Sequence, residues 1–411
     1  MSQKSKAPVD HRLTIRYAIL QVFYWMAFSS IFTYAAVYLH DHGFDNQQVG
    51  ITLALGYLTA MIIQPVAAAF VDRSETISLN QFCALTSSVL LAAVLTLMAL
   101  PKVFPVMVVL FVLIEMLILL LQPLLYSLSL NFINQGIAVN FGLARGLGSG
   151  SFALTSLLVG IAIARFGTSV VLVTCAASTM LVIVFILNFK AEQPNTETIS
   201  ELAHRPVSQK PLPENTLQFL AHYPGFPLFL VGLVLILTNQ QMFSNYQINI
   251  IEHIGGTSKI LGMAAAIAAI TEIPVMGYFS FFVRKVSARK LLLISAAFFI
   301  VKALATLLAA NVGQFLFSQI FQAGSYAIYL PASVYYVNSI MHSGDTVKGQ
   351  AFLGVTFTMG GIIGSLLGGF LLDATSVPVT LIAGLGMTVL GAILVYVGTR
   401  RKDQTTMVEN Q

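Results

Sequence analysis

Residues 141–160 read FGLARGLGSGSFALTSLLVG, and this stretch decides the fold class. It is apolar, yet it holds one arginine, Arg145, and a dense set of small residues. Glycine at this density weakens a helix in water, whereas in a bilayer it lets helices approach closely, as the spacing of Gly146 and Gly150 would allow. A guanidinium inside such a helix must face protein or water. The stretch therefore predicts a membrane helix whose Arg145 face lines a polar cavity.

A similar glycine-rich stretch occurs in the second half of the chain. Residues 349–369 read GQAFLGVTFTMGGIIGSLLGG, and their segment 365–369 aligns with segment 156–160 of the first stretch. Two parallel halves with matched helices are typical of one class of secondary transporter. A chance match between two glycine-rich membrane helices is the alternative interpretation.

The composition places the chain in a bilayer. Of its 411 residues, 57% are hydrophobic and only 9% are charged, whereas soluble domains carry about 25% charged residues. Cys83 and Cys175 both lie inside apolar runs and are expected to be packing residues. The polar N-terminus shows no cleavage site, so we expect no removable signal peptide. No nucleic-acid-binding patch, metal site or cofactor motif is predicted.

Twelve apolar runs are long enough to cross a bilayer, which needs about 20 residues. They lie near 14–39, 47–71, 79–100, 103–130, 141–165, 168–189, 226–251, 258–283, 289–310, 313–340, 349–373 and 377–399. Residues 190–215 are polar and contain proline, which is typical of a flexible linker. The sequence therefore predicts an all-α integral membrane protein with an N-terminal six-helix bundle (1–189), a cytoplasmic linker (190–215) and a C-terminal six-helix bundle (216–411).

Lysine and arginine predict the orientation. If both termini are cytoplasmic, the outer side holds only Lys102, Arg165 and Lys259, and most other basic residues fall inside. This bias agrees with the positive-inside rule. We expect a multi-pass protein of the cell membrane with both termini in the cytoplasm.

Four ionisable residues fall well within the predicted spans: Glu115, Arg145, Glu272 and Lys302. Ionisable groups at this depth are functional candidates by default, and a structural ion pair is the alternative. Counting about 1.5 Å per residue puts Glu272 and Lys302 at similar depths, so they can pair. Arg145 lies nearer the inner end of its helix than Glu115, which makes a direct bridge between those two less favoured.

Three predicted spans, 14–39, 226–251 and 313–340, are rich in amides, hydroxyls and aromatic rings, among them Trp25, Asn245, Gln322 and Tyr326. Polar groups in this number are expensive in lipid and suit a hydrated cavity. Aromatic faces interleaved with amides suit a sugar, whose C–H face stacks while its hydroxyls form hydrogen bonds. The alternative is that these groups only join helices to one another.

At this point the chain resembles the major facilitator superfamily over about residues 14–400, and within it the branch of lactose permease and oligosaccharide:proton symporters. The motifs that carry the resemblance are Tyr38-Leu39 with Gly43 and Gly50, Gln64-Pro65 before Asp72-Arg73, Phe141-Gly142-x-Ala144-Arg145 before Gly148, Thr271-Glu272, and Lys302.

The resemblance implies roles for four residues in a major facilitator fold. Arg145 would contact sugar hydroxyls, and Phe152 would stack on the sugar ring. Glu272 would contact the sugar and take part in proton coupling, and Lys302 would tune the proton site. The sequence departs from the branch at two places. Residues 124–127 after Pro123 carry no glutamate, and residues 322–325 carry neither the histidine nor the glutamate of the family's coupling site. Glu115 is a candidate for a displaced carboxylate.

We therefore expect a monomeric secondary active transporter that moves a sugar or glycoside by proton symport with alternating access around a central site. The expected substrate contacts are Arg145, Phe152, Glu272, Trp25, Asn245, Gln322 and Tyr326, and the expected proton-coupling residues are Glu272, Lys302 and Glu115. Efflux of sugars or amphipathic drugs and nucleoside:proton symport are the alternatives within transport. A membrane enzyme is disfavoured because no His-x-x-x-His or Cys–His cluster falls within a span, and a sensor because 190–215 is too short for a folded domain.

Overall fold

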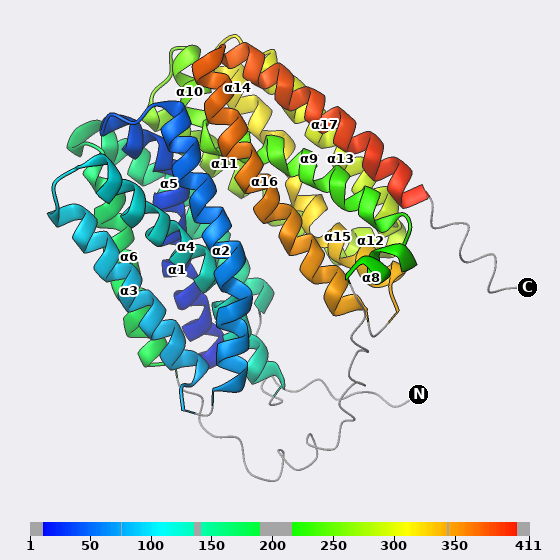
Figure 1. Ribbon diagram of the computed structural model, residues 1–411, viewed down its shortest axis with the longest axis horizontal. Coiled ribbons are helices and arrows are strands. Elements are labelled where there is room, and N and C mark those ends of the chain that lie inside the picture. Colours follow the sequence, from blue (N-terminus) through cyan, green and yellow to red (C-terminus); the bar gives the residue numbers. More distant parts are fainter. Residues whose placement is uncertain (1–10, 75, 135–140, 190–215, 343–344, 401–411) are drawn as a thin grey trace, which may run out of the picture. The chain divides into compact units, whose positions relative to one another are not determined.

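The computed structural model describes residues 11–74, 76–134, 141–189, 216–342 and 345–400, and every regular element in these ranges is a helix (Figure 1). The first half contains α1 (His11–Asp41), α2 (Asn46–Arg73), α3 (Leu79–Ala99), α4 (Phe104–Asn134), α5 (Phe141–Phe166) and α6 (Ser169–Leu187). The second half contains α8 (Thr216–His222), α9 (Phe226–Asn245), α10 (Gln247–His253), α11 (Ser258–Gly277), α12 (Phe279–Lys285), α13 (Ala288–Leu307), α14 (Val312–Ser318), η1 (Gln319–Ala323), α15 (Tyr326–Ile340), α16 (Thr346–Ala374) and α17 (Val377–Arg400).

Eleven of the described helices are long and apolar enough to cross a membrane. They correspond to eleven of the twelve predicted spans, so the predicted all-α integral membrane protein is confirmed. The remaining predicted span, 313–340, is divided among α14, η1 and α15, each of which is too short to cross a bilayer alone. The predicted linker, 190–215, lies outside the described residues.

The division of this span has a local cause at Gly324 and Ser325. The ring of Phe298 lies where a side chain on residue 324 would stand, so only glycine fits there. Ser325 then takes a non-helical conformation, with φ −87° and ψ −90°. The hydroxyl of Ser295 donates a hydrogen bond of 2.8 Å to the carbonyl of Ser325. Irregular backbone at membrane depth persists where protein groups supply such partners.

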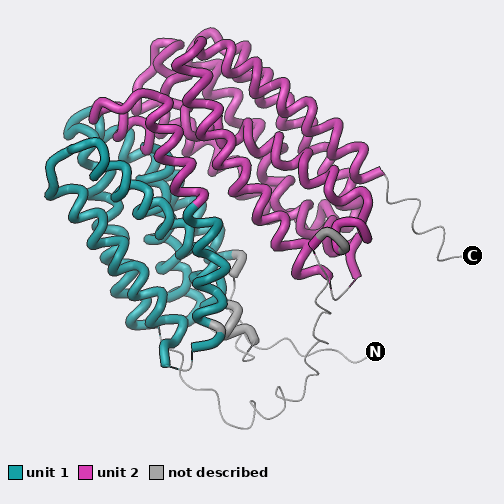
Figure 2. Tube along the Cα trace, in the orientation of Figure 1, with its two compact units in different colours: residues 1–34, 59–207 teal, residues 35–58, 208–411 magenta. Residues whose placement is uncertain are grey.

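The chain folds into two compact units, and their boundaries fall inside α1 and α2 (Figure 2). One unit comprises residues 1–34 and 59–207, and the other comprises 35–58 and 208–411. The predicted bundles, 1–189 and 216–411, do not anticipate that residues 35–58, the end of α1 and the start of α2, belong with the second half. We call the first group unit 1 and the second group unit 2.

Within unit 2, polar contacts join the start of α2 to the end of α16. Both carboxylate oxygens of Asp373 accept hydrogen bonds of 2.7 Å, one from the Asn46 side chain and one from the Gln47 backbone N–H. The hydroxyl of Tyr246 donates to the carbonyls of Ser365 (2.7 Å) and Asn46 (3.2 Å). A carboxylate at a helix N-terminus satisfies N–H groups that have no partner inside the helix. These contacts explain why the segment 35–58 groups with unit 2.

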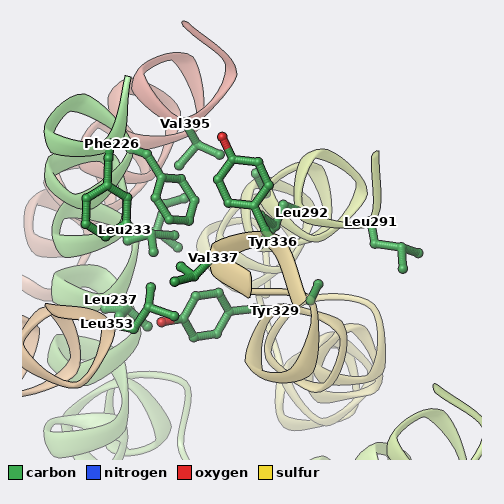
Figure 3. Packing of buried hydrophobic residues seen from close by; sticks show 14 of the residues in the cluster. Phe226, Leu233, Leu237, Leu291, Leu292, Tyr329, Tyr336, Val337, Leu353 and Val395 are labelled. Carbon is green, nitrogen blue, oxygen red and sulfur yellow. The ribbon is translucent and has the colours of Figure 1, made fainter. Parts of the chain in front are cut away.

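The centre of unit 2 is α9, which makes its most extensive contacts with α16 and α17. The α16 contact runs along Gly360, Gly364 and Gly368, where an added Cβ would lie 2.6–2.8 Å from atoms of α9. Here the glycine-rich stretch of the second half lets two helices approach closely, as predicted. Beside it, buried aromatic and aliphatic side chains such as Phe226, Leu233 and Tyr336 form the apolar core (Figure 3).

In unit 1, α3 packs against α4 and α6. Pro123 lies inside α4 and has no N–H to donate to the carbonyl of Leu119. The amide nitrogen of Gln64 on α2 donates to that carbonyl at 3.0 Å, so the group freed by the proline is satisfied. The expected close approach at Gly146 and Gly150 is wrong, because no described atom lies within 4 Å of a Cβ built on either glycine.

Candidate functional site

Arg145 lies on α5 beside the aromatic rings of α1 in unit 1. Its guanidinium carbon is 4.1 Å from the centroid of the Trp25 ring, which is a cation–π contact. One of its terminal nitrogens donates a hydrogen bond of 2.6 Å to the hydroxyl of Ser149, one helical turn further along. Arginine has five N–H donors, and within the described residues this is the one hydrogen bond that Arg145 makes. Within the described part of the chain, its other N–H donors have no hydrogen-bond acceptor.

The small residues of α5 make room for Trp25. A Cβ on Gly148 would lie 2.5 Å from the indole ring, so the ring fits against α5 only where that residue is glycine. The indole N–H of Trp25 donates to the side-chain oxygen of Gln21 at 3.2 Å, which fixes the ring from the other side. Phe152 stands edge-on to Trp25, with ring centroids 6.3 Å apart. The structure therefore brings together three predicted substrate contacts: Arg145, Trp25 and Phe152.

Unit 2 holds a second cluster, in which Gln322 lies between two of the three predicted proton-coupling residues, Lys302 and Glu272. The ammonium of Lys302 donates to the side-chain oxygen of Gln322 at 2.5 Å, and the amide nitrogen of Gln322 donates to a carboxylate oxygen of Glu272 at 2.8 Å. Lysine has no acceptor and an ionised glutamate has no donor. The amide can therefore take only this orientation without placing like charges or like dipoles together.

Lys302 has further partners on α9, although it is only 5% exposed. Its ammonium lies 3.5 Å from the side-chain oxygen of Gln240 and 4.7 Å from the centroid of the Phe243 ring. The same residues border a small pocket lined by Asn239, Gln240, Phe243, Phe299, Lys302, Ala303, Thr306 and Leu381. An ammonium with two amide oxygens and one aromatic ring beside it can hold its charge at this depth.

The irregular turn described above places Gln322 in this cluster. Gln322 belongs to η1, the short 3-10 segment, which packs against both α11, the helix of Glu272, and α13, the helix of Lys302. A 3-10 segment within a membrane-spanning region frequently marks a functional hinge. The position of the amide between the two charges thus depends on the break in the helix.

Three other predicted site residues have different recorded contacts. Asn245 donates a hydrogen bond of 2.8 Å to the hydroxyl of Ser365 and so joins α9 to α16. The ring of Tyr326 lies 5.9 Å from that of Tyr329. Glu115 is buried on α4, and neither of its oxygens has a hydrogen-bond partner within the described residues. The structure thus brings predicted site residues together in two clusters, one around Arg145 and one around Lys302.

Two aromatic residues of these clusters were not predicted from the sequence. Phe28 lies 4.9 Å from Trp25 and 6.4 Å from Phe152, measured between ring centroids. Phe243 is the ring beneath Lys302. Phenylalanine is common in apolar spans, so neither residue stands out by type. The available signal was helical spacing, since Phe28 follows Trp25 by three residues and Phe243 follows Gln240 by three.

Comparison with protein-family models finds a match over most of the chain. The family model described as the MFS_1 like family matches residues 14–383. A search of curated proteins finds no match.

Several solved transporters have a similar fold. The nucleoside transporter NupG matches with a TM-score of 0.75 at 14% identity, over 94% of this chain and 98% of that chain. The POT family transporter PepTSo matches with a TM-score of 0.72 at 10% identity, over 97% and 99%. A bacterial homolog of the human lysosomal transporter Spinster matches with a TM-score of 0.65 at 12% identity, over 95% and 96%. At these identities the likeness is one of fold.

Proposed function

Because the chain belongs to the MFS_1-like family, and is thus a multi-pass transporter of the major facilitator superfamily and no enzyme, we propose that it moves a sugar or glycoside by proton symport. It works by alternating access as a monomer in the cell membrane, with both termini cytoplasmic. The substrate binds at Arg145, Trp25 and Phe152, and the proton is carried by Glu272 with Lys302 as its neighbouring charge.

The observation that supports the proposal most directly is the set of contacts made by the Arg145 guanidinium. An arginine that only locks helices together would spend its donors on carbonyls or a carboxylate. Among the described residues, Arg145 instead contacts an aromatic ring and one hydroxyl, and its remaining donors lie beside the rings of Trp25 and Phe152. A sugar fits this arrangement, because its hydroxyls accept hydrogen bonds from guanidinium while its C–H face stacks on a ring.

A nucleoside is the second candidate, and one observation favours it. The rings of Trp25, Phe28, Phe32 and Phe152 form a continuous aromatic cluster, with Phe28 and Phe32 stacked at 4.2 Å between centroids. Such a surface suits a flat base, while the ribose hydroxyls meet Arg145. A nucleoside is itself a glycoside, so both candidates use the same contacts.

The direct experiment is uptake into proteoliposomes with a panel of mono- and oligosaccharides, aryl glycosides and nucleosides, with and without an inward proton gradient. We expect accumulation of one class only when the gradient is present. In Glu272→Gln, uphill accumulation should be lost while exchange of the same substrate persists. Accumulation at wild-type levels in Glu272→Gln would exclude this residue as the carrier.

Binding can be followed before the substrate is known, because Trp25 is the sole tryptophan of the chain. Its indole contacts the guanidinium of Arg145, so a ligand that engages Arg145 should change the tryptophan emission. The same panel can therefore be screened by fluorescence on purified protein, with Trp25→Phe as the control that should give no signal.

A further inference from the structure

Glu115 differs from the other ionisable side chains buried in the spans. It is 1% exposed, and both carboxylate oxygens lack a hydrogen-bond partner among the described residues. By contrast, Arg145 has Ser149, and Gln322 contacts both Lys302 and Glu272. A buried carboxylate with neither a cation nor a donor is strongly disfavoured, and such a group takes up a proton instead.

The depth of Glu115 follows from two contacts between α1 and α4. The hydroxyl of Tyr24 donates to the carbonyl of Ile118, and that of Tyr17 donates to the carbonyl of Leu125. The two pairs are seven residues apart on each helix and run in opposite directions, which makes the helices antiparallel. This register puts Glu115 level with Ala27 of α1, about 5 Å along α4 from Ile118.

Among the described residues, no side chain around that level hydrogen-bonds to Glu115. Its helical neighbours at three and four residues are apolar: Phe111, Ile118 and Leu119 are buried, and Val112 is half-buried. Two hydroxyls on the adjacent helices are used within their own helices: Ser30 donates to the carbonyl of Ala27, and Ser87 of α3 donates to that of Cys83. The carboxyl group therefore lies in an apolar layer of unit 1.

In the part of the chain that the structure describes, the helices that contact α4 carry no charged side chain at this depth. On α1 the titratable groups toward α4 are Tyr17 and Tyr24, whose hydroxyls are engaged as described, and α3 carries only Cys83. On α2, whose Gln64 contacts α4, ionised side chains occur only in the last turn. Among the described cations of unit 1, Arg145 lies nearest to this level, because its guanidinium contacts Trp25, two residues from Ala27 on α1. Its guanidinium is directed to Trp25 and Ser149.

We propose that Glu115 is a proton-binding site of unit 1, separate from Glu272 in unit 2, and that it is occupied by a proton in this conformation. The proton leaves when the apolar layer opens enough for water or for the guanidinium of Arg145 to reach the carboxyl group. Because Arg145 is also the proposed substrate residue, engagement of Arg145 by substrate keeps the proton on Glu115. The coupling part of this proposal rests on the proposed function, whereas the protonated state does not.

Infrared spectroscopy tests the protonated state on the full chain in lipid, because a carboxylic acid has a C=O stretch that a carboxylate lacks. At neutral pH we expect this band in the wild type and in Glu272→Gln, and its loss in Glu115→Gln. Glu115→Asp should keep the band at a shifted frequency, which assigns it even if the Gln variant folds poorly. An unchanged band in Glu115→Gln, or its loss in Glu272→Gln alone, would overturn the assignment.

The coupling part is tested with the substrate found in the panel. Adding that substrate should leave the Glu115 band in place in the wild type, whereas Arg145→Lys should lose part of it as the pH is raised through the alkaline range. If proton-driven accumulation is normal in Glu115→Gln, its proton is structural and the coupling is wrong. If the wild type shows no proton-driven accumulation at all, the proposed function fails while the infrared assignment stands.

Discussion

Gln322→Leu should destabilise the protein, because Gln322 connects two buried charges. The substitution keeps a similar volume but removes the acceptor for Lys302 at 2.5 Å and the donor to Glu272 at 2.8 Å. Interhelical hydrogen bonds in bilayers contribute about 0.6 kcal/mol on average and up to about 1.7. Two such bonds, both to charged groups, therefore predict a loss of about 1–3 kcal/mol in the free energy of unfolding.

The measurement is unfolding by titration with dodecyl sulfate, followed by circular dichroism, with thermal melting as a second measure. Gln240→Leu is the matched control, since it removes only the 3.5 Å contact to Lys302 and a 3.4 Å contact to Ser244. It should change stability by less than about 0.6 kcal/mol. A Gln322→Leu protein as stable as the wild type would refute the idea that the amide connects the charges energetically.

A charge exchange adds a second criterion. Gln322→Glu alone places two carboxylates side by side and should destabilise by at least as much as Gln322→Leu. Combined with Glu272→Gln, it puts a carboxylate next to Lys302 and returns an amide donor at position 272. The double variant should then recover to within about 1 kcal/mol of the wild type. Strictly additive losses would mean that the two positions do not interact.

Three further predictions concern the substrate site, the contact of Asp373 with the start of α2, and the orientation of the protein in the membrane. Arg145→Lys should leave the melting temperature unchanged and weaken binding of the confirmed substrate by about 2 kcal/mol, because lysine lacks the planar fork of donors. Phe152→Ala should weaken binding of the same substrate. If Arg145→Lys binds normally but melts at a lower temperature, Arg145 is a structural residue that holds helices together. Asp373→Asn should lower the stability of unit 2 by about 1 kcal/mol, the usual effect of losing a helix N-terminal acceptor, as measured by thermal melting against Asp373→Glu. Proteases should cut 190–215 in inside-out vesicles, and cleavage only from the outer face would reverse the predicted topology.

The fold was predictable from the sequence because one physical requirement dominates it. Segments that cross a bilayer must be apolar over about 20 residues, and such runs are easy to recognise. The predicted span 313–340 is the exception, because its helix breaks at Gly324 and Ser325. The break depends on the ring of Phe298 and the hydroxyl of Ser295, which come from another helix. Hydropathy carries no information about such tertiary partners.

The candidate site was predictable by residue type and less so by arrangement. Arg145, Glu272 and Lys302 stand out because charge is rare in a membrane span. Gln322 was expected to contact substrate, but its amide lies between Lys302 and Glu272 because an irregular turn places it there. The role of Gly148 was also hidden, because only the fold shows that it makes room for Trp25. Pairwise contacts between helices cannot be read from one helix at a time.

The two units differ in the partners of their ionisable side chains within the spans, and this difference bears on where substrate and protons bind. In unit 2, Lys302 has an amide oxygen, a second amide and an aromatic ring, so its charge is already accommodated. In unit 1, and among the described residues, Arg145 makes one hydrogen bond and Glu115 makes none. Polar groups without hydrogen-bond partners are costly in a bilayer, and they are retained where a ligand or a proton binds them during part of the transport cycle. A substrate hydroxyl at Arg145 and a proton on Glu115 are the partners that fit these two groups.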